Sequence, residues 1–149
     1  MGTIRGERTV EIEAPVARCF DIAADIEGAP AWQGSLVEVA VLERDGDGRP
    51  ALVETVNDAK VRRIRTRVRF RYEPPVAIDW VQERGDVKAL AGWWRLEALD
   101  GGRTRATYGL EVDPGRVLGL LVRGPVVDQV REHLLGRASQ GLKEQAESG

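Results

Sequence analysis

The C-terminal segment from Pro125 to Glu147 places the strongest constraint on how this chain folds. Apolar residues recur there at steps of three and four, and charged residues fill most of the other positions. This spacing predicts a helix of about 20 residues with one apolar stripe. The stripe consists of Val127, Val130, Leu134, Ala138 and Leu142. Because such a stripe needs a large apolar surface to pack against, the rest of the chain is expected to supply one.

Two small residues, Gly136 and Gly141, lie on or beside this stripe, together with Ala138. Small side chains leave space beneath a helix, so we expect room for a cavity between the helix and its supporting surface. Pro125 suits the first turn of the helix, where no backbone N–H is needed.

The segments before this helix predict an antiparallel sheet. Thr9–Glu13 alternates apolar and polar residues, as a half-buried strand does. Residues 15–28 have helical spacing that ends at Gly28, and the irregular segment around Trp32 indicates a second short helix or turn. Alternation then resumes, and six further strands are expected at residues 36–42, 51–56, 61–72, 76–83, 88–99 and 104–112. Because short turns join these strands, they are expected to pair in an antiparallel sheet within a single α+β domain, 1–149.

Composition excludes several classes of site. Lysine and arginine total 22 against 24 acidic residues, for a net charge of −2, which argues against a nucleic-acid binder. Cys19 and His133 are single residues of their types, so an internal disulfide and most zinc sites are excluded. We expect no metal and no cofactor. No segment is typical of a signal peptide or a membrane span, so a cytoplasmic protein without stable membrane insertion is expected.

An arginine run from Arg63 to Arg71 occupies every second position of the expected strand 61–72. Strict alternation indicates one exposed sheet face rather than a phosphate-binding cluster. Neighbouring strands carry Glu54, Asp79 and Glu83 at outward positions, so we expect cross-strand ion pairs there.

The chain resembles the START/Bet v 1-like (SRPBCC) superfamily, most closely the bacterial polyketide cyclase/dehydrase and lipid-transport group. The resemblance depends on Ala14-Pro15, on Asp25-Ile26-Glu27 ahead of Pro30 and Trp32, and on the strand motif Gly92-x-Trp94-x-Leu96. It implies a helix-grip fold: a seven-stranded curved antiparallel sheet wrapped around a long C-terminal helix. It also implies two short helices between strands 1 and 2 and an internal hydrophobic cavity.

Inward-facing positions of the expected sheet are rich in aromatic rings, which suit a flat apolar ligand. The first functional hypothesis is a carrier or binding protein for a small hydrophobic molecule, aromatic and polyketide- or lipid-like. Its expected ligand contacts are Thr66, Val68, Phe70, Tyr72, Trp80, Trp94, Tyr108, Leu110, Val130 and Leu134.

The second hypothesis is a polyketide cyclase, aromatase or dehydratase that needs neither a metal nor a nucleotide cofactor. Its candidate acid/base groups are Arg62, Tyr72, Tyr108 and His133. Arg62 shares the strand parity of Ile64, so it lies either in the cavity or at its mouth. A third hypothesis is an interaction module that uses an outward-facing Trp93. Both a monomer and a homodimer are compatible with the sequence.

Overall fold

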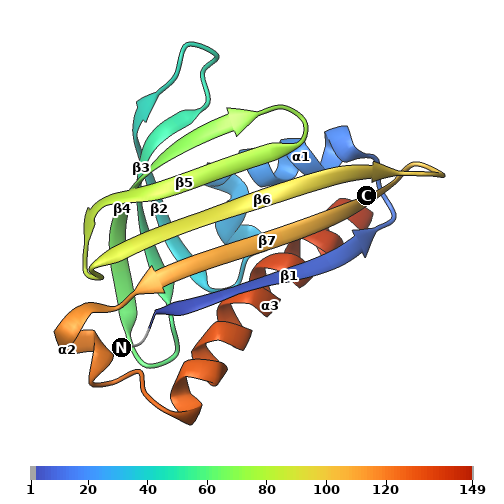
Figure 1. Cartoon of the computed structure of the whole chain (residues 1–149). Coiled ribbons are helices and arrows are strands. Elements are labelled where there is room, and N and C mark those ends of the chain that lie inside the picture. The colour runs from blue at the N-terminus through green and yellow to red at the C-terminus, as the bar shows by residue number, and fades with distance from the viewer. Residues whose placement is uncertain (1–2, 149) are drawn as a thin grey trace.

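The computed structural model describes residues 3–148; residues 1, 2 and 149, at the ends of the expected domain 1–149, lie outside the described residues. The predicted α+β helix-grip fold is confirmed, with two short helices after the first strand (Figure 1). The elements follow in the order β1 (Ile4–Ile12), α1 (Val16–Ala24), η1 (Ile26–Ala31), β2 (Leu36–Arg44), β3 (Pro50–Asp58), β4 (Arg63–Glu73), β5 (Ala77–Gly85), β6 (Ala89–Leu99), β7 (Arg103–Asp113), α2 (Gly115–Gly119) and α3 (Pro125–Glu147).

The seven strands form one antiparallel sheet in the order β1-β7-β6-β5-β4-β3-β2. Each of β2 to β7 pairs with its neighbour in sequence, and β1 joins the far side of β7. The sheet curves, and α3 crosses its concave side against β1, β7 and α1 (Figure 1). Lys143 Nζ donates to the Glu11 carbonyl oxygen at 2.9 Å, and Glu147 Oε2 accepts from the Glu13 N–H at 2.8 Å. These bonds tie the end of α3 to the end of β1.

The buried face of α3 is wider than the predicted stripe, because Leu135, Ser139, Gly141 and Ala146 are also buried. A Cβ at Gly141 would lie 2.1 Å from the Trp32 carbonyl oxygen. The absent side chain therefore brings α3 close to the chain after η1. The expectation that the small residues of α3 leave room for a cavity is wrong at this position.

Several element boundaries differ from those predicted. Helix α1 ends at Ala24, and Gly28 lies inside η1, where its N–H donates to Asp25 Oδ1 at 3.3 Å. Strand β1 begins at Ile4 rather than at Thr9, because β7 is long enough to pair with it from Val112 onward. Backbone pairing, which local alternation does not reveal, sets these limits.

The arginines of β4 alternate along the outer face of the sheet, as predicted. The Glu54 carboxylate forms ion pairs with the guanidinium groups of Arg65, at 2.9 Å, and Arg67, at 3.2 Å. Arg69 pairs with Glu83. The predicted cross-strand pairing is thus confirmed for Glu54 and Glu83. Asp79 instead pairs with Arg95 of β6, at 2.7 Å.

Candidate ligand-binding cavity

A cavity of about 120 Å³ lies between the concave face of the sheet and α3. Strands β3 to β7 supply the largest share of its wall, β1 contributes Ile4, and α3 contributes Val130 and Leu134. Helix η1 and the short helix α2 add apolar side chains at its ends. Val61 and Arg62, in the turn between β3 and β4, are exposed and border the cavity, so this turn marks its mouth.

Aromatic rings form a continuous wall on the sheet side of the cavity. The ring centroid of Trp80 lies 5.5 Å from that of Phe70 and 5.8 Å from that of Tyr108. The ring centroid of Trp94 lies 4.8 Å from that of Tyr108. Such tilted, closely spaced rings stabilise one another and present a broad apolar surface. The wall extends across β4, β5, β6 and β7, which the sheet order places next to one another.

All but one of the expected ligand contacts border the cavity: Thr66, Val68, Phe70, Trp80, Trp94, Tyr108, Leu110, Val130 and Leu134. The exception is Tyr72. Its hydroxyl donates to the Pro50 carbonyl oxygen at 2.6 Å, and the Arg49 guanidinium lies 5.7 Å from its ring centroid. Burial raises the pKa of Tyr72. Tyr72 therefore packs beyond the cavity, near the hairpin between β2 and β3.

The candidate acid/base groups do not gather at one point. Arg62 precedes β4 rather than belonging to it, so the parity argument does not apply, and its side chain lies exposed at the mouth. His133 lies outside the lining, with Nε2 3.1 Å from the Asp58 carbonyl oxygen. Tyr108 and Arg62 remain as candidates that border the cavity.

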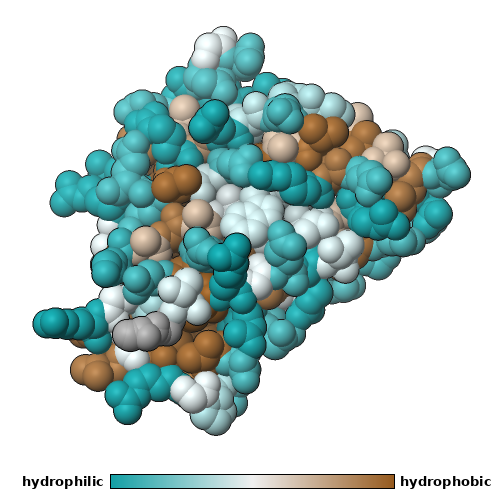
Figure 2. All heavy atoms as spheres, in the orientation of Figure 1, coloured by the Kyte–Doolittle hydropathy of each residue, from teal (hydrophilic) through white to brown (hydrophobic). Residues whose placement is uncertain are grey.

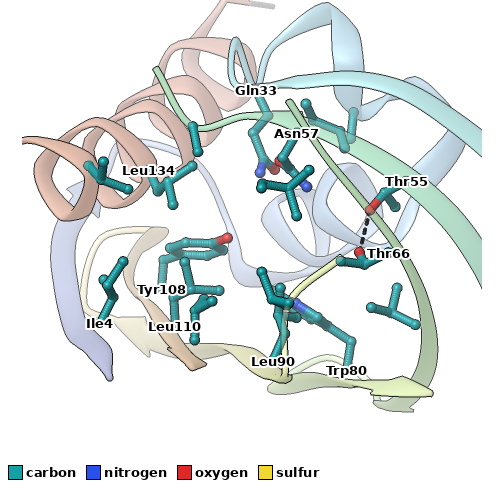
Figure 3. A pocket seen from close by; sticks show the side chains of 18 of the residues that line it. Ile4, Gln33, Thr55, Asn57, Thr66, Trp80, Leu90, Tyr108, Leu110 and Leu134 are labelled. Atoms are coloured by element: carbon teal, nitrogen blue, oxygen red, sulfur yellow. Dashed lines mark hydrogen bonds between the residues drawn. The ribbon is translucent and has the colours of Figure 1, made fainter. Parts of the chain in front are cut away.

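Two amide side chains, Gln33 and Asn57, give the cavity a polar side that the sequence analysis missed. Figure 3 shows both pointing into the cavity. Burial raises the pKa of the Tyr108 hydroxyl, which borders the same cavity, and this keeps the hydroxyl neutral. The alternation that marks Thr55 as inward-facing extends to Asn57, whereas Gln33 lies in an irregular segment with no periodic signal.

The remaining polar lining is internally paired. The hydroxyls of Thr55 and Thr66 lie 3.0 Å apart across β3 and β4 (Figure 3). Both residues are buried, and each hydroxyl satisfies the other. The amides of Gln33 and Asn57, with the hydroxyl of Tyr108, are therefore the groups best placed to meet a polar atom of a ligand.

The chain between β7 and α3 closes one end of the cavity. Leu118 and Val122 are buried and line it. Their spacing of four residues in the short apolar segment 117–122 is the sequence signal that could have identified them.

Within residues 3–148, no set of three or more His, Cys, Asp or Glu side chains is arranged to hold a metal ion. No helix in the same range has the length and apolar character that a membrane span requires. Among the described cavity residues, Arg62 alone carries a charge, so the interior suits an uncharged apolar molecule.

A curved antiparallel sheet that holds a long helix over an apolar cavity defines a helix-grip protein with a ligand-binding fold. Residues 12–138 match the family model described as polyketide cyclase / dehydrase and lipid transport, and the chain belongs to this family. The resemblance to the START superfamily is thereby confirmed. The comparison with curated proteins found no match.

Solved structures agree with the fold. A START superfamily protein from Mycobacterium smegmatis is 21% identical with a TM-score of 0.84, covering 98% of each chain. A protein from Thermus thermophilus is 22% identical with a TM-score of 0.80, covering 97% of each chain. The Zhui aromatase/cyclase from Streptomyces sp. R1128 is 21% identical with a TM-score of 0.75, covering 98% of this chain and 94% of its own. At these identities the likeness concerns the fold alone.

Proposed function

We propose that this protein is a carrier or binding protein for a small, largely apolar molecule that contains a ring. The observation that supports this function best is the aromatic wall of Phe70, Trp80, Trp94 and Tyr108 facing an interior without charged groups. Apolar pockets with a few oriented polar groups are typical of small-molecule sites.

The cavity volume supports a ligand of about one ring, and a second ring fits only if the lining moves. Dry apolar cavities of about 150 Å³ in proteins accept benzene. At about 120 Å³, the cavity is somewhat smaller, so one ring needs a slight adjustment of the lining and two rings need a larger one. A larger polyketide- or lipid-like ligand would require a greater movement of the lining.

The amides favour a ligand that also has an uncharged polar substituent. Asn57 has both a donor and an acceptor, so it accommodates either a carbonyl or a hydroxyl group. Burying a carboxylate beside these neutral groups would be costly because no cation lies inside the cavity. A phenol or an aromatic ketone meets both requirements.

Titration of the purified protein with naphthalene and with 1-naphthol tests the proposal. We expect saturable binding of both compounds, tighter for 1-naphthol, and a selective loss of that preference in Asn57→Leu. Leu134→Trp fills the cavity and should abolish binding, whereas Gln140→Trp, on the exposed face of the same helix, should not. The proposal fails if the wild type binds neither compound, or if the folded Leu134→Trp variant binds both as well as the wild type.

Native mass spectrometry of freshly purified protein, with organic extraction of any adduct, identifies the class of natural ligand. An apolar, ring-containing adduct that survives desalting supports the proposal. A charged, ring-free adduct contradicts it.

The alternative is a polyketide cyclase, aromatase or dehydratase. The family match and the fold shared with an aromatase/cyclase favour it, as does the position of Arg62 and Tyr108 on the same cavity. An arginine at the mouth would stabilise an enolate as charge develops, and the neutral phenol would donate a hydrogen bond to a carbonyl oxygen. Turnover of a model poly-β-ketone that is lost in both Arg62→Ala and Tyr108→Phe would support the enzyme. Binding without turnover above the uncatalysed rate would support the carrier.

A further inference from the structure

Three exposed apolar side chains project from α2 and the residues that follow it. Val117 is 73% exposed, Leu120 is 68% exposed and Leu121 is 51% exposed. We refer to these three residues as the apolar tip. Figure 1 places α2 at a corner of the molecule, and Figure 2 shows hydrophobic atoms at the same corner. Isolated exposed apolar residues are ordinary, but a cluster at a corner indicates a contact surface.

Basic residues are concentrated in the segments near the apolar tip. The three segments that meet there, residues 58–63, 84–88 and 113–124, contain seven basic and three acidic residues, a net charge of +4 in a chain whose total is −2. A shallow hollow joins the segments, with Arg62, Lys88 and Arg116 on its border. We refer to the seven basic residues as the basic rim: Lys60, Arg62, Arg63, Arg84, Lys88, Arg116 and Arg123.

The acidic residues of these segments do not neutralise the basic rim. Asp58 accepts from the Lys60 N–H, and Asp86 accepts from the Arg65 N–H. Asp113 accepts from the Gly115 N–H and reaches Lys88 only at 4.0 Å. Within residues 3–148, the six other side chains of the basic rim have no carboxylate within 4 Å. Their charges are free to attract an anionic surface.

We propose that this end of the molecule docks on an anionic lipid bilayer. The apolar tip enters the boundary between headgroups and acyl chains, and the basic rim contacts the anionic headgroups. A bilayer fits better than a folded acidic partner because the apolar tip projects from a corner, and all three segments near it carry basic residues.

The docking surface adjoins the cavity at Arg62, which borders both, and along the short segment 117–122. Leu118 and Val122 face the cavity, whereas Val117, Leu120 and Leu121 face outward from the same short segment. Movement of this segment towards the bilayer would open the cavity next to the acyl chains. This second step, exchange of a ligand with the bilayer, rests on the proposed function; docking itself does not.

Co-sedimentation of the ligand-free protein with vesicles tests docking. We expect binding to phosphatidylcholine vesicles that contain phosphatidylglycerol, none to phosphatidylcholine alone, and weaker binding as salt rises. Leu120→Ser with Leu121→Ser should weaken partitioning by about tenfold or more. Arg116→Gln and Arg123→Gln should each weaken it by about fivefold.

Two exposed residues elsewhere provide matched controls. Val81 on β5 is 58% exposed, and Arg71 on β4 is an exposed arginine with no carboxylate within 4 Å among the described ion pairs. Val81→Ser and Arg71→Gln should bind vesicles as the wild type does. Absence of binding to anionic vesicles, or an equal loss in these controls, overturns the proposal. Self-association or capture of an acidic protein that depends on Leu120 and Leu121, without vesicle binding, overturns it in favour of a protein partner. Because vesicle binding is measured without ligand, its failure is distinct from failure of the carrier function.

Discussion

The indole of Trp80 lies flat against Gly92 and occupies the space of a side chain at that position. A Cβ on Gly92 would lie 2.3 Å from Cε2 of Trp80. On the opposite face of the sheet, Trp93 covers Gly109 in the same way, where a Cβ would lie 1.9 Å from Cε2 of Trp93. One tryptophan–glycine pair therefore shapes the cavity wall, and the other provides its control on the outer surface.

Gly92→Ala should displace Trp80 towards the cavity. We expect it to lose about 1–3 kcal/mol of unfolding free energy, the usual range for overpacking. We also expect the affinity for 1-naphthol to fall by about tenfold or more, equivalent to about 1.4 kcal/mol. Urea denaturation and ligand titration measure the two effects.

Gly109→Ala is the control, because it should cost similar stability while leaving 1-naphthol affinity unchanged. Trp93 lies on the outer face, where its Nε1 donates to Glu7 Oε2 at 2.8 Å. Equal affinity losses in both variants would show that general destabilisation, rather than the position of Trp80, controls binding.

Gly141→Ala should destabilise the protein, although alanine favours helices. The new Cβ would lie 2.1 Å from a backbone oxygen of Trp32, so α3 must move away. We expect a net loss of about 2–3 kcal/mol in unfolding free energy. Gly136→Ala, whose Cβ would meet nothing closer than Arg8 Nη1 at 3.8 Å, should instead gain up to about 1 kcal/mol. Urea midpoints that change in the same direction would contradict this interpretation.

Thr66→Val should cost about 1–3 kcal/mol because it leaves the buried hydroxyl of Thr55 without a partner. The two hydroxyls lie 3.0 Å apart, and Thr66 is 1% exposed. Thr55→Val combined with Thr66→Val removes both polar groups, so the double variant should lose less than the sum of the single losses. A double-mutant cycle by urea denaturation measures the coupling, and strictly additive losses would disprove it.

Glu54→Gln should make the free energy of unfolding less dependent on pH in the acid range. Hydrogen bonds from Arg67, which has the larger effect, and from Arg65 lower the pKa of Glu54 from its ordinary value of 4.5. The folded pKa lies below the unfolded one, so the stabilisation is present above pH 4.5 and disappears as pH falls through the folded value. The wild type should therefore be more stable than the variant at neutral pH, and the difference should shrink below pH 4.5.

Urea midpoints at neutral pH and in acid measure this difference. Glu38→Gln is the control, because no described cation lies within 4 Å of Glu38 among the ion pairs that involve β2 and β3. A gap between wild type and Glu54→Gln that stays constant with pH would exclude the proposed contribution of Arg65 and Arg67.

The amino-acid sequence by itself determined the elements and their faces. Alternation along β4 separates the paired arginines from Thr66 and Val68, because successive side chains of a strand point to opposite faces. Three- and four-residue spacing likewise identifies the helix α3 and part of its buried side. Because short turns join consecutive strands from β2 to β7, the sequence also predicts that these strands pair in an antiparallel sheet.

Tertiary structure alone decided which inward residues meet the cavity. Tyr72 and Thr66 share one face of β4, yet Thr66 lines the cavity and Tyr72 bonds to Pro50 beyond it. Gln33 reaches the cavity from an irregular segment, and Gly141 contacts Trp32 across elements. Periodicity reports the direction of a side chain from its own backbone. The curvature of the sheet and the position of α3 decide what lies opposite it, and these depend on contacts between residues far apart in the chain.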